Sequence, residues 1–332
     1  MAGTNGGIAK CGFIFLDTLA IALVVLPALL FRLPGFDLPV FQRGFFCSDE
    51  TISYPYKDST VPSTVLYAVG IGLYLVIMVT TEIVIFAYRK RQDLDYLSPD
   101  TYNRCCGGVV IPPLLYQIVR YTAVFFFGLL VTMTTFDITK NVVGRLRPHF
   151  LDICQPDFDN LTCSEGAHQM YITDDICQPD FDNLTCSEGA HQMYITDDVC
   201  MPEDPKRMLE ARRSFPSGHA AIAVYTMLFV VLYMQSRWSW RDTVFLRPLV
   251  QVIALFLALY TCLSRISDYK HHWSDVFGGA VMGGSIAAAM AFGVSDLFRQ
   301  GRSPHNHPGG RGGHDLVFME MNPRTRKSDG LI

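Results

Sequence analysis

Six apolar stretches constrain the fold of this chain more than any other feature of its sequence. They cover roughly residues 12–31, 64–88, 118–138, 218–235, 247–264 and 276–295. Each is close to the ~20 residues that a helix needs to cross the hydrocarbon core of a bilayer. Charged residues make up 17% of the chain, against about 25% in soluble domains. We therefore predict an all-α integral membrane protein with six transmembrane helices.

One membrane domain over residues 1–297 accounts for all six stretches, and residues 298–332 are predicted to be a disordered cytosolic tail. The first stretch could instead be the apolar part of a signal peptide. Only Lys10 precedes it, however, and no convincing small-residue cleavage site follows, so we interpret it as a retained anchor. Small residues such as Gly279 and Gly283 in the last stretch permit close helix packing, and they favour a homo-oligomer.

Two acidic residues, Asp17 and Glu82, interrupt the first and second stretches. An acid inside a membrane is either part of a functional site or a polar contact between helices. We favour the contact between helices for both residues.

The side of the membrane on which each loop lies follows from two glycosylation sequons. Asn160-Leu-Thr and Asn183-Leu-Thr both lie between the third and fourth stretches, and N-glycosylation requires a non-cytosolic location. The outer loops are then about 32–63, 139–217 and 264–275, and both termini are cytosolic. Cys47 and five cysteines of the second outer loop predict disulfides, whose pairing the sequence leaves open. We expect a multi-pass protein of the plasma membrane, or of an internal membrane with a lumenal site.

A perfect tandem repeat lies in the second outer loop. Residues 152–174 recur without change as residues 175–197. Structural repeats diverge in sequence, and a solenoid core needs three or more of them. The two copies therefore indicate either a recent duplication or an artefact of sequence assembly, and we assign them no chemistry.

The first of three polar clusters follows the third stretch, in the segment from Lys140 to Arg147-Pro148. The two cations are seven residues apart, which on a helix places them two turns apart on one face. A lysine and an arginine fork can together hold the oxygens of a phosphate. Alone, the segment would equally suit a basic patch against lipid headgroups.

The second cluster is Pro216-Ser217-Gly218-His219, at the start of the fourth stretch. Proline, serine and glycine at a helix start leave backbone N–H groups free to bind an anion. His219 follows directly, where a general acid could act. The simpler alternative is an ordinary helix cap beside a surface histidine.

The third cluster lies between the fifth and sixth stretches and contains Arg265, His271 and Asp275. His271 and Asp275 are four residues apart, so on a helix their side chains can meet. A carboxylate on one ring nitrogen fixes the tautomer and leaves the other nitrogen as the better nucleophile. His272, three residues before Asp275, is an alternative partner, and a pH-sensitive surface pair is the non-catalytic explanation.

All three clusters fall on the non-cytosolic face of the predicted topology. Together they offer three cations, an N–H cradle, two histidines and an orienting acid. This combination suits phosphoryl transfer, in which positioning and charge neutralisation supply most of the rate acceleration. No acid-rich group of the metal-ligand type accompanies the clusters, so we predict no cofactor and no metal.

These motifs resemble the three signature motifs of the type-2 phosphatidate phosphatase superfamily. Segments 42–47 (QRGFFC) and 54–57 (YPYK) are similar to those of the animal lipid phosphate phosphatases, and the resemblance covers about residues 10–297. It implies metal-independent hydrolysis of phosphatidate, lysophosphatidate, ceramide 1-phosphate or sphingosine 1-phosphate. In the implied mechanism His271 attacks phosphorus while Asp275 holds its ring, and His219 protonates the leaving oxygen and then activates water. The implied phosphate-binding residues are Lys140, Arg147, Ser217, Gly218 and Arg265.

Other functions explain the sequence less completely. Haloperoxidases with a similar oxyanion site are mostly soluble, and glucose-6-phosphatase-like enzymes have more spans. A catalytically weak relative that acts as a signalling or adhesion scaffold would typically lack some of the catalytic residues. A transporter or receptor would explain the hydropathy but not the three clusters. The net charge of −4 argues against a nucleic-acid partner, so the expected partners are lipid phosphates in the bilayer.

Overall fold

The structure is a computed structural model that describes residues 19–27, 39–46, 49–92, 111–156, 194–195, 200–201, 204–238, 244–295 and 297–298. Residues 19–27 of the first predicted span are helical, and the rest of that span, including Asp17, lies outside the described residues. Both sequons, most of the tandem repeat and the tail after residue 298 also lie outside them.

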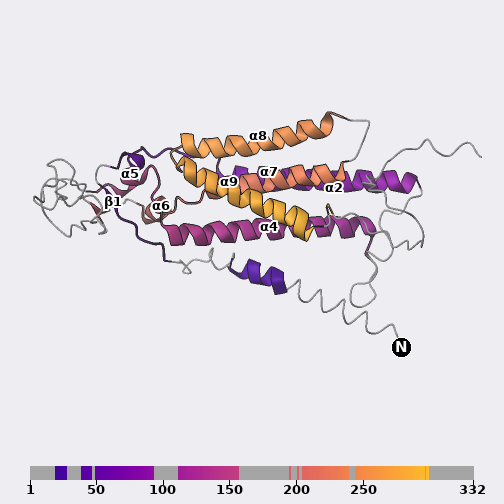
Figure 1. Cartoon of the computed structure of the whole chain (residues 1–332), viewed down its shortest axis with the longest axis horizontal. Helices are drawn as coiled ribbons and strands as arrows, with labels where there is room; N and C mark the ends of the chain where they lie inside the picture. Colours follow the sequence, from indigo (N-terminus) through magenta and orange to yellow (C-terminus); the bar gives the residue numbers. More distant parts are fainter. Residues whose placement is uncertain are drawn as a thin grey trace, which may run out of the picture.

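Five helices in the described part of the chain are long and apolar enough to cross a membrane. They are α2 (Ser63–Arg91), α4 (Pro113–Val143), α7 (Gly218–Arg237), α8 (Leu246–Ser267) and α9 (Trp273–Ala288), which η2 (Ala289–Val294) continues as a π-helix. They run side by side along the long axis of the molecule (Figure 1). The five correspond to the second to sixth predicted stretches and confirm an all-α membrane protein.

Helix α7 is the centre of the bundle and packs against α2, α4, α8 and α9. Its contact with α9 is close because α9 presents glycines: a Cβ on Gly283 would collide with the backbone carbonyl of Ala221. Small residues allow such close backbone approach in membranes. The α8 surface instead exposes large apolar side chains, including Leu255, Phe256 and Leu259, as expected of a helix that faces lipid.

Glu82 is fully buried between α2 and α7. Arg237 of α7 donates hydrogen bonds to both of its carboxylate oxygens, at 2.9 and 2.8 Å, and the Tyr233 hydroxyl donates a third at 2.7 Å. Glu82 therefore makes the polar contact between helices that we favoured from the sequence.

A small cap of short elements covers one end of the bundle (Figure 1). It contains η1 (Glu50–Ile52), α5 (Phe150–Cys154), α6 (Pro205–Ala211) and a two-stranded antiparallel sheet of β1 (Phe45–Phe46) and β2 (Tyr194–Ile195). A disulfide joins Cys154 to Cys200, which confirms the prediction of disulfides in this loop. The apolar core of the cap includes Phe45, Ile52, Leu146, Phe150, Met208 and Ala211. The cap fixes the loops that follow α4 and precede α7.

Candidate active site

A cavity of about 400 Å³ lies under the cap, where α2, α7 and α9 begin and α4 and α8 end. Six of the eight residues predicted to bind phosphate or to catalyse line this cavity: Lys140, Arg147, Gly218, His219, Arg265 and His271. The other two, Ser217 and Asp275, are fully buried behind its wall. Residues up to 131 positions apart in the chain therefore meet in one cavity rich in positive charge.

Lys140 and Arg147 reach the cavity in a different way from the one predicted. The helix α4 ends at Val143, and Gly144 has a left-handed backbone with φ of 55°. A Cβ there would collide with the Phe41 carbonyl, so glycine suits this turn. The prediction that both cations share one helix face was wrong, because the chain turns at Gly144 and an Arg147 N–H bond of 2.8 Å to Ala211 returns it to the cavity.

Arg147 is nearly buried, and its Nε has no hydrogen-bond partner among the described residues. Burial lowers the pKa of its guanidinium. The Glu210 carboxylate of α6 lies 3.7 Å away and is largely exposed. An under-neutralised buried cation is costly unless an anion binds beside it, so this residue favours an anionic ligand.

Arg265 occupies the last turn of α8 and points into the same cavity. One terminal nitrogen donates to Ser59 Oγ at 3.2 Å and the other to the Val61 carbonyl at 3.4 Å. Its Nε, like that of Arg147, lacks a hydrogen-bond partner in the described ranges. Asp268 lies 3.9 Å away but also accepts two 2.7 Å hydrogen bonds from Thr60. The loop before α2 thus holds the arginine in place.

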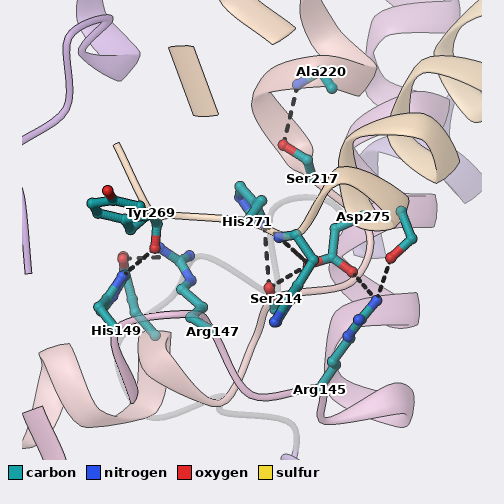
Figure 2. Close-up of polar contacts among 12 residues, drawn as sticks. Arg145, Arg147, His149, Ser214, Ser217, Ala220, Tyr269, His271 and Asp275 are labelled. Carbon is teal, nitrogen blue, oxygen red and sulfur yellow. Dashed lines mark hydrogen bonds and ion pairs between the residues drawn. The ribbon is translucent and has the colours of Figure 1, made fainter. Parts of the chain in front are cut away.

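His219 lies in the first turn of α7, and its Nε2 is buried without a hydrogen-bond partner in the described part of the chain. The other ring nitrogen is engaged by the backbone of Val61. The cradle predicted next to it is only partly present. Gly218 lines the cavity, whereas the Ser217 hydroxyl caps α7 by accepting from the Ala220 N–H at 3.4 Å (Figure 2). The Ser217 N–H is occupied as well, because it donates to the Asp275 carbonyl at 2.9 Å.

His271 and Asp275 approach each other, but not along a helix as predicted. The helix α9 begins at Trp273, so His271 lies in the preceding turn, and its Nδ1 is 3.9 Å from Asp275 Oδ2. The Ser214 hydroxyl lies between them: it donates to Asp275 at 2.6 Å and is 3.5 Å from His271 Nδ1 (Figure 2). Burial and nearby cations hold the pKa of His271 well below its usual range, which keeps the ring neutral near pH 7.

Asp275 has closer partners than His271. The alternative partner His272 caps α9, with its Nδ1 at 3.2 Å and its N–H at 3.0 Å from Asp275 Oδ2. Arg145 donates to Asp275 Oδ1 at 2.6 Å and to Ser274 at 2.7 Å. The carboxylate is therefore fixed from three sides, and Ser214 is the group that connects it to His271.

Sequence reasoning assigned no role to three further residues that line the cavity: Tyr56, His149 and Lys270. The Lys270 ammonium lies 3.4 Å from the centre of the Tyr56 ring, and burial lowers its pKa to about 8. Burial also lowers the pKa of His149 to about 4. The sequence positions of two of them could have indicated a role in the site, because His149 directly follows Arg147-Pro148 and Lys270 directly precedes His271.

The cavity can bind an anion with several charges and present it to two histidines. Lys140, Arg147, Arg265 and Lys270 supply positive charge around it. The histidine pair offers a neutral ring nitrogen as a nucleophile and a second ring for proton transfer. Apolar side chains from α2 and α7, among them Leu66 and Ile222, complete the wall toward the bundle.

Comparisons with known proteins identify the family to which the chain belongs. Residues 121–299 match the PAP2 superfamily. The chain is 33% identical to phospholipid phosphatase 1 of Mus musculus, over 88% of this chain and 87% of the relative. It is 32% identical to phospholipid phosphatase 1 of Rattus norvegicus, over 86% of each, and 31% identical to phospholipid phosphatase 2 of Homo sapiens, over 86% of this chain and 84% of the relative. No solved structure matches the chain. On this evidence the chain belongs to the PAP2 superfamily and is a lipid phosphatase.

Proposed function

We propose that this protein hydrolyses lipid phosphate monoesters to the free lipid and inorganic phosphate, through a phosphohistidine on His271 and without a divalent metal. One observation carries the proposal: His219 and His271 line the same buried cavity as Lys140, Arg147 and Arg265. The substrates would be phosphatidate, lysophosphatidate, sphingosine 1-phosphate and ceramide 1-phosphate. The names of the relatives, phospholipid phosphatases, support a phospholipid among them.

In the first step His271 Nε2 forms a bond to phosphorus, and the bond between phosphorus and the lipid oxygen breaks. His271 Nδ1 faces Ser214 and Asp275, which leaves Nε2 as the attacking nitrogen. His219 donates a proton to the departing lipid oxygen, so that the lipid leaves as an alcohol. Its Nε2 has no hydrogen-bond partner among the described residues and is the nitrogen available for this transfer.

In the second step a water molecule attacks the phosphohistidine. His219, now neutral, takes a proton from the water, a bond forms between the water oxygen and phosphorus, and the bond to His271 breaks. This step releases inorganic phosphate and returns the rings of His219 and His271 to their original protonation states. The Ser214 hydroxyl would orient His271 throughout, by accepting from Nδ1–H while it donates to Asp275.

The cations would replace the metal ions of other phosphatases. The transferred phosphoryl group carries its charge on three outer oxygens, and fixed positive groups stabilise them best in a site that excludes water. Arg147, Arg265 and Lys270, all nearly buried around one cavity, are such groups. We place the cavity on the non-cytosolic face, where both predicted sequons lie, with both termini in the cytosol.

Detection of the phosphohistidine intermediate tests the proposed function. Lysophosphatidate carrying a radioactive phosphate should label the protein chain, and the label should survive alkali and be released by acid, as expected for a nitrogen–phosphorus bond. His271→Gln should abolish the label. His219→Gln should accumulate it with an aryl phosphate, whose leaving group departs without a proton.

The alternative function is a catalytically weak scaffold in the membrane. A folded, membrane-inserted chain that neither acquires label nor releases phosphate from any of the four lipids would favour the scaffold. An acid-stable label would instead place the intermediate on an oxygen nucleophile, and the assignment of His271 would be wrong.

A further inference from the structure

The turn that carries His271 contains an unfavourable backbone conformation. Tyr269 has φ of 53°, in the left-handed region that residues with a side chain rarely occupy. It lies in the short connection between α8 and α9, two residues before His271. The N–H groups of Lys270 and His271 both bond to the Arg265 carbonyl, at 3.1 and 3.2 Å. The backbone at Tyr269 therefore leads directly into two residues that line the cavity, Lys270 and His271.

Two groups from other loops contact Tyr269. His149 Nδ1 lies 2.7 Å from the Tyr269 carbonyl (Figure 2), and because a carbonyl only accepts, Nδ1 must carry the proton. The Tyr54 ring stacks on the Tyr269 ring, with centroids 4.6 Å apart. Strained backbone of this kind persists where its surroundings fix it, and it is concentrated at functional sites.

His149 itself is firmly anchored. It is 2% exposed, at the start of α5, and the next residue, Phe150, is fully buried in the core of the cap. The Tyr54 N–H donates to the Pro148 carbonyl at 2.9 Å, and the Phe150 N–H donates to the Arg147 carbonyl at 3.0 Å. The ring is thus fixed in position relative to Arg147, two residues earlier, which lines the cavity as a phosphate-binding candidate.

We infer that His149 is a positioning residue: its hydrogen bond to the Tyr269 carbonyl holds the turn over residues 268–272 in the conformation that aims His271 at a phosphate bound by Arg147. The inference rests on the proposed role of His271 as nucleophile. Burial lowers the pKa of His149 to about 4, so the ring is neutral in the working range and its single proton stays on Nδ1.

Three substitutions of His149 separate the hydrogen bond from the bulk of the ring. His149→Asn places an amide N–H near the position of Nδ1, His149→Gln places it near Nε2, and His149→Leu has no donor. We expect His149→Leu and His149→Gln to lower kcat for lysophosphatidate by about 100-fold, the loss that a misplaced reacting group can cause. KM should change by less than about 3-fold, because the cations that bind phosphate are untouched. His149→Asn should retain most of the wild-type kcat.

Substitutions of Tyr269 test the mechanism directly. Glycine adopts the left-handed conformation readily, so a chain with Tyr269→Gly needs the His149 hydrogen bond less. In that background His149→Leu should cost only about 10-fold in kcat, a departure from additivity expected of coupled residues. Tyr269→Phe keeps both the ring and the strain, and in this matched control the loss should remain about 100-fold.

The pH profile distinguishes positioning from partial unfolding. In the His149→Leu variant the acid limb of kcat/KM should move upward, toward the pKa of an ordinary histidine, because His271 leaves its buried position. The charged and titratable groups around His271 are Lys140, Arg147, His219, Arg265 and Asp275. A variant that was merely unstable would lose amplitude without moving this limb.

Each outcome decides the inference. Wild-type kcat in His149→Leu, equal activity of His149→Asn and His149→Gln, or the same loss in the Tyr269→Gly and Tyr269→Phe backgrounds would overturn it while the proposed function stood. No phosphate release from the unaltered chain would overturn the proposed function, and the positioning role with it.

Discussion

The Ser214 hydroxyl donates a hydrogen bond of 2.6 Å to Asp275 Oδ2, and neither residue has exposed surface. The same hydroxyl oxygen faces His271 Nδ1 at 3.5 Å, while the carboxylate itself is 3.9 Å from that nitrogen. The hydroxyl that lies between the acid and the histidine therefore comes from a serine that none of the three sequence motifs contains. Ser214 lies three residues before Ser217, in the segment that leads into α7.

Replacement of Ser214 by alanine should lower kcat by about 10- to 100-fold, because His271 loses the group that fixes its tautomer and orientation. KM should change little. Thr226→Ala is a matched control, since this hydroxyl is also fully buried but bonds only within α7. Steady-state kinetics on lysophosphatidate in detergent micelles make the comparison, and equal losses in the two variants would mean that Ser214 serves packing alone.

The acid limb of the pH profile should lie below pH 6.5. Burial and four neighbouring cationic or titratable groups lower the pKa of His271. A group with a lowered pKa gives up its proton at lower pH, so the neutral nucleophile is already present well below 6.5 and is lost only as the pH falls further. The profile of kcat/KM for lysophosphatidate checks this, and an acid limb at or above 6.5 would contradict it.

Lys270 should shape the alkaline side of the profile. Its pKa is lowered to about 8, so the ammonium is present below pH 8 and loses its charge as the pH rises through this value. We expect KM for a lipid phosphate to rise above pH 8 as the cavity loses one positive charge. Lys270→Arg should move the rise to higher pH, and Lys270→Gln should show a raised KM at every pH. Identical profiles for the three proteins would exclude Lys270 from binding.

The Glu82–Arg237 pair should support the fold and not the chemistry. It lies at the end of the bundle opposite the cap, and Glu82 is fully buried. Removal of one partner of a buried pair costs about 3–5 kcal/mol because it leaves the other charge uncompensated. Glu82→Ala should therefore lower the thermal unfolding temperature in detergent, while kcat per folded molecule is unchanged. A loss of kcat without a loss of stability would instead give Glu82 a role in the reaction.

The helices of the bundle could be predicted from the sequence, because a membrane span is recognised by the length and hydrophobicity of one continuous stretch. The helix from Leu246 to Ser267 lies within three residues of its predicted bounds at each end. The conformation of the loops between the helices could not be predicted in this way. The turn at Gly144 and the start of α9 at Trp273 depend on contacts with distant segments, so helical spacing misplaced Arg147 and His271.

The site residues that the sequence analysis did not find share one property: their partners are distant in sequence. Ser214 meets Asp275 across 61 residues, Arg145 meets it across 130, and His149 meets Tyr269 across 120. Spacing rules apply within one helix, where residues three or four apart are neighbours. They therefore found His272 as a partner of Asp275 but could find none of these three residues.

Phosphate release from lysophosphatidate in detergent micelles with EDTA present, by the purified protein and by its His271→Ala variant, tests the central claim most directly. We predict steady release by the unaltered protein that the substitution abolishes, with the variant still folded and inserted. Release that EDTA stops and Mg²⁺ restores, or release that survives His271→Ala, would contradict a metal-independent phosphatase with a histidine nucleophile.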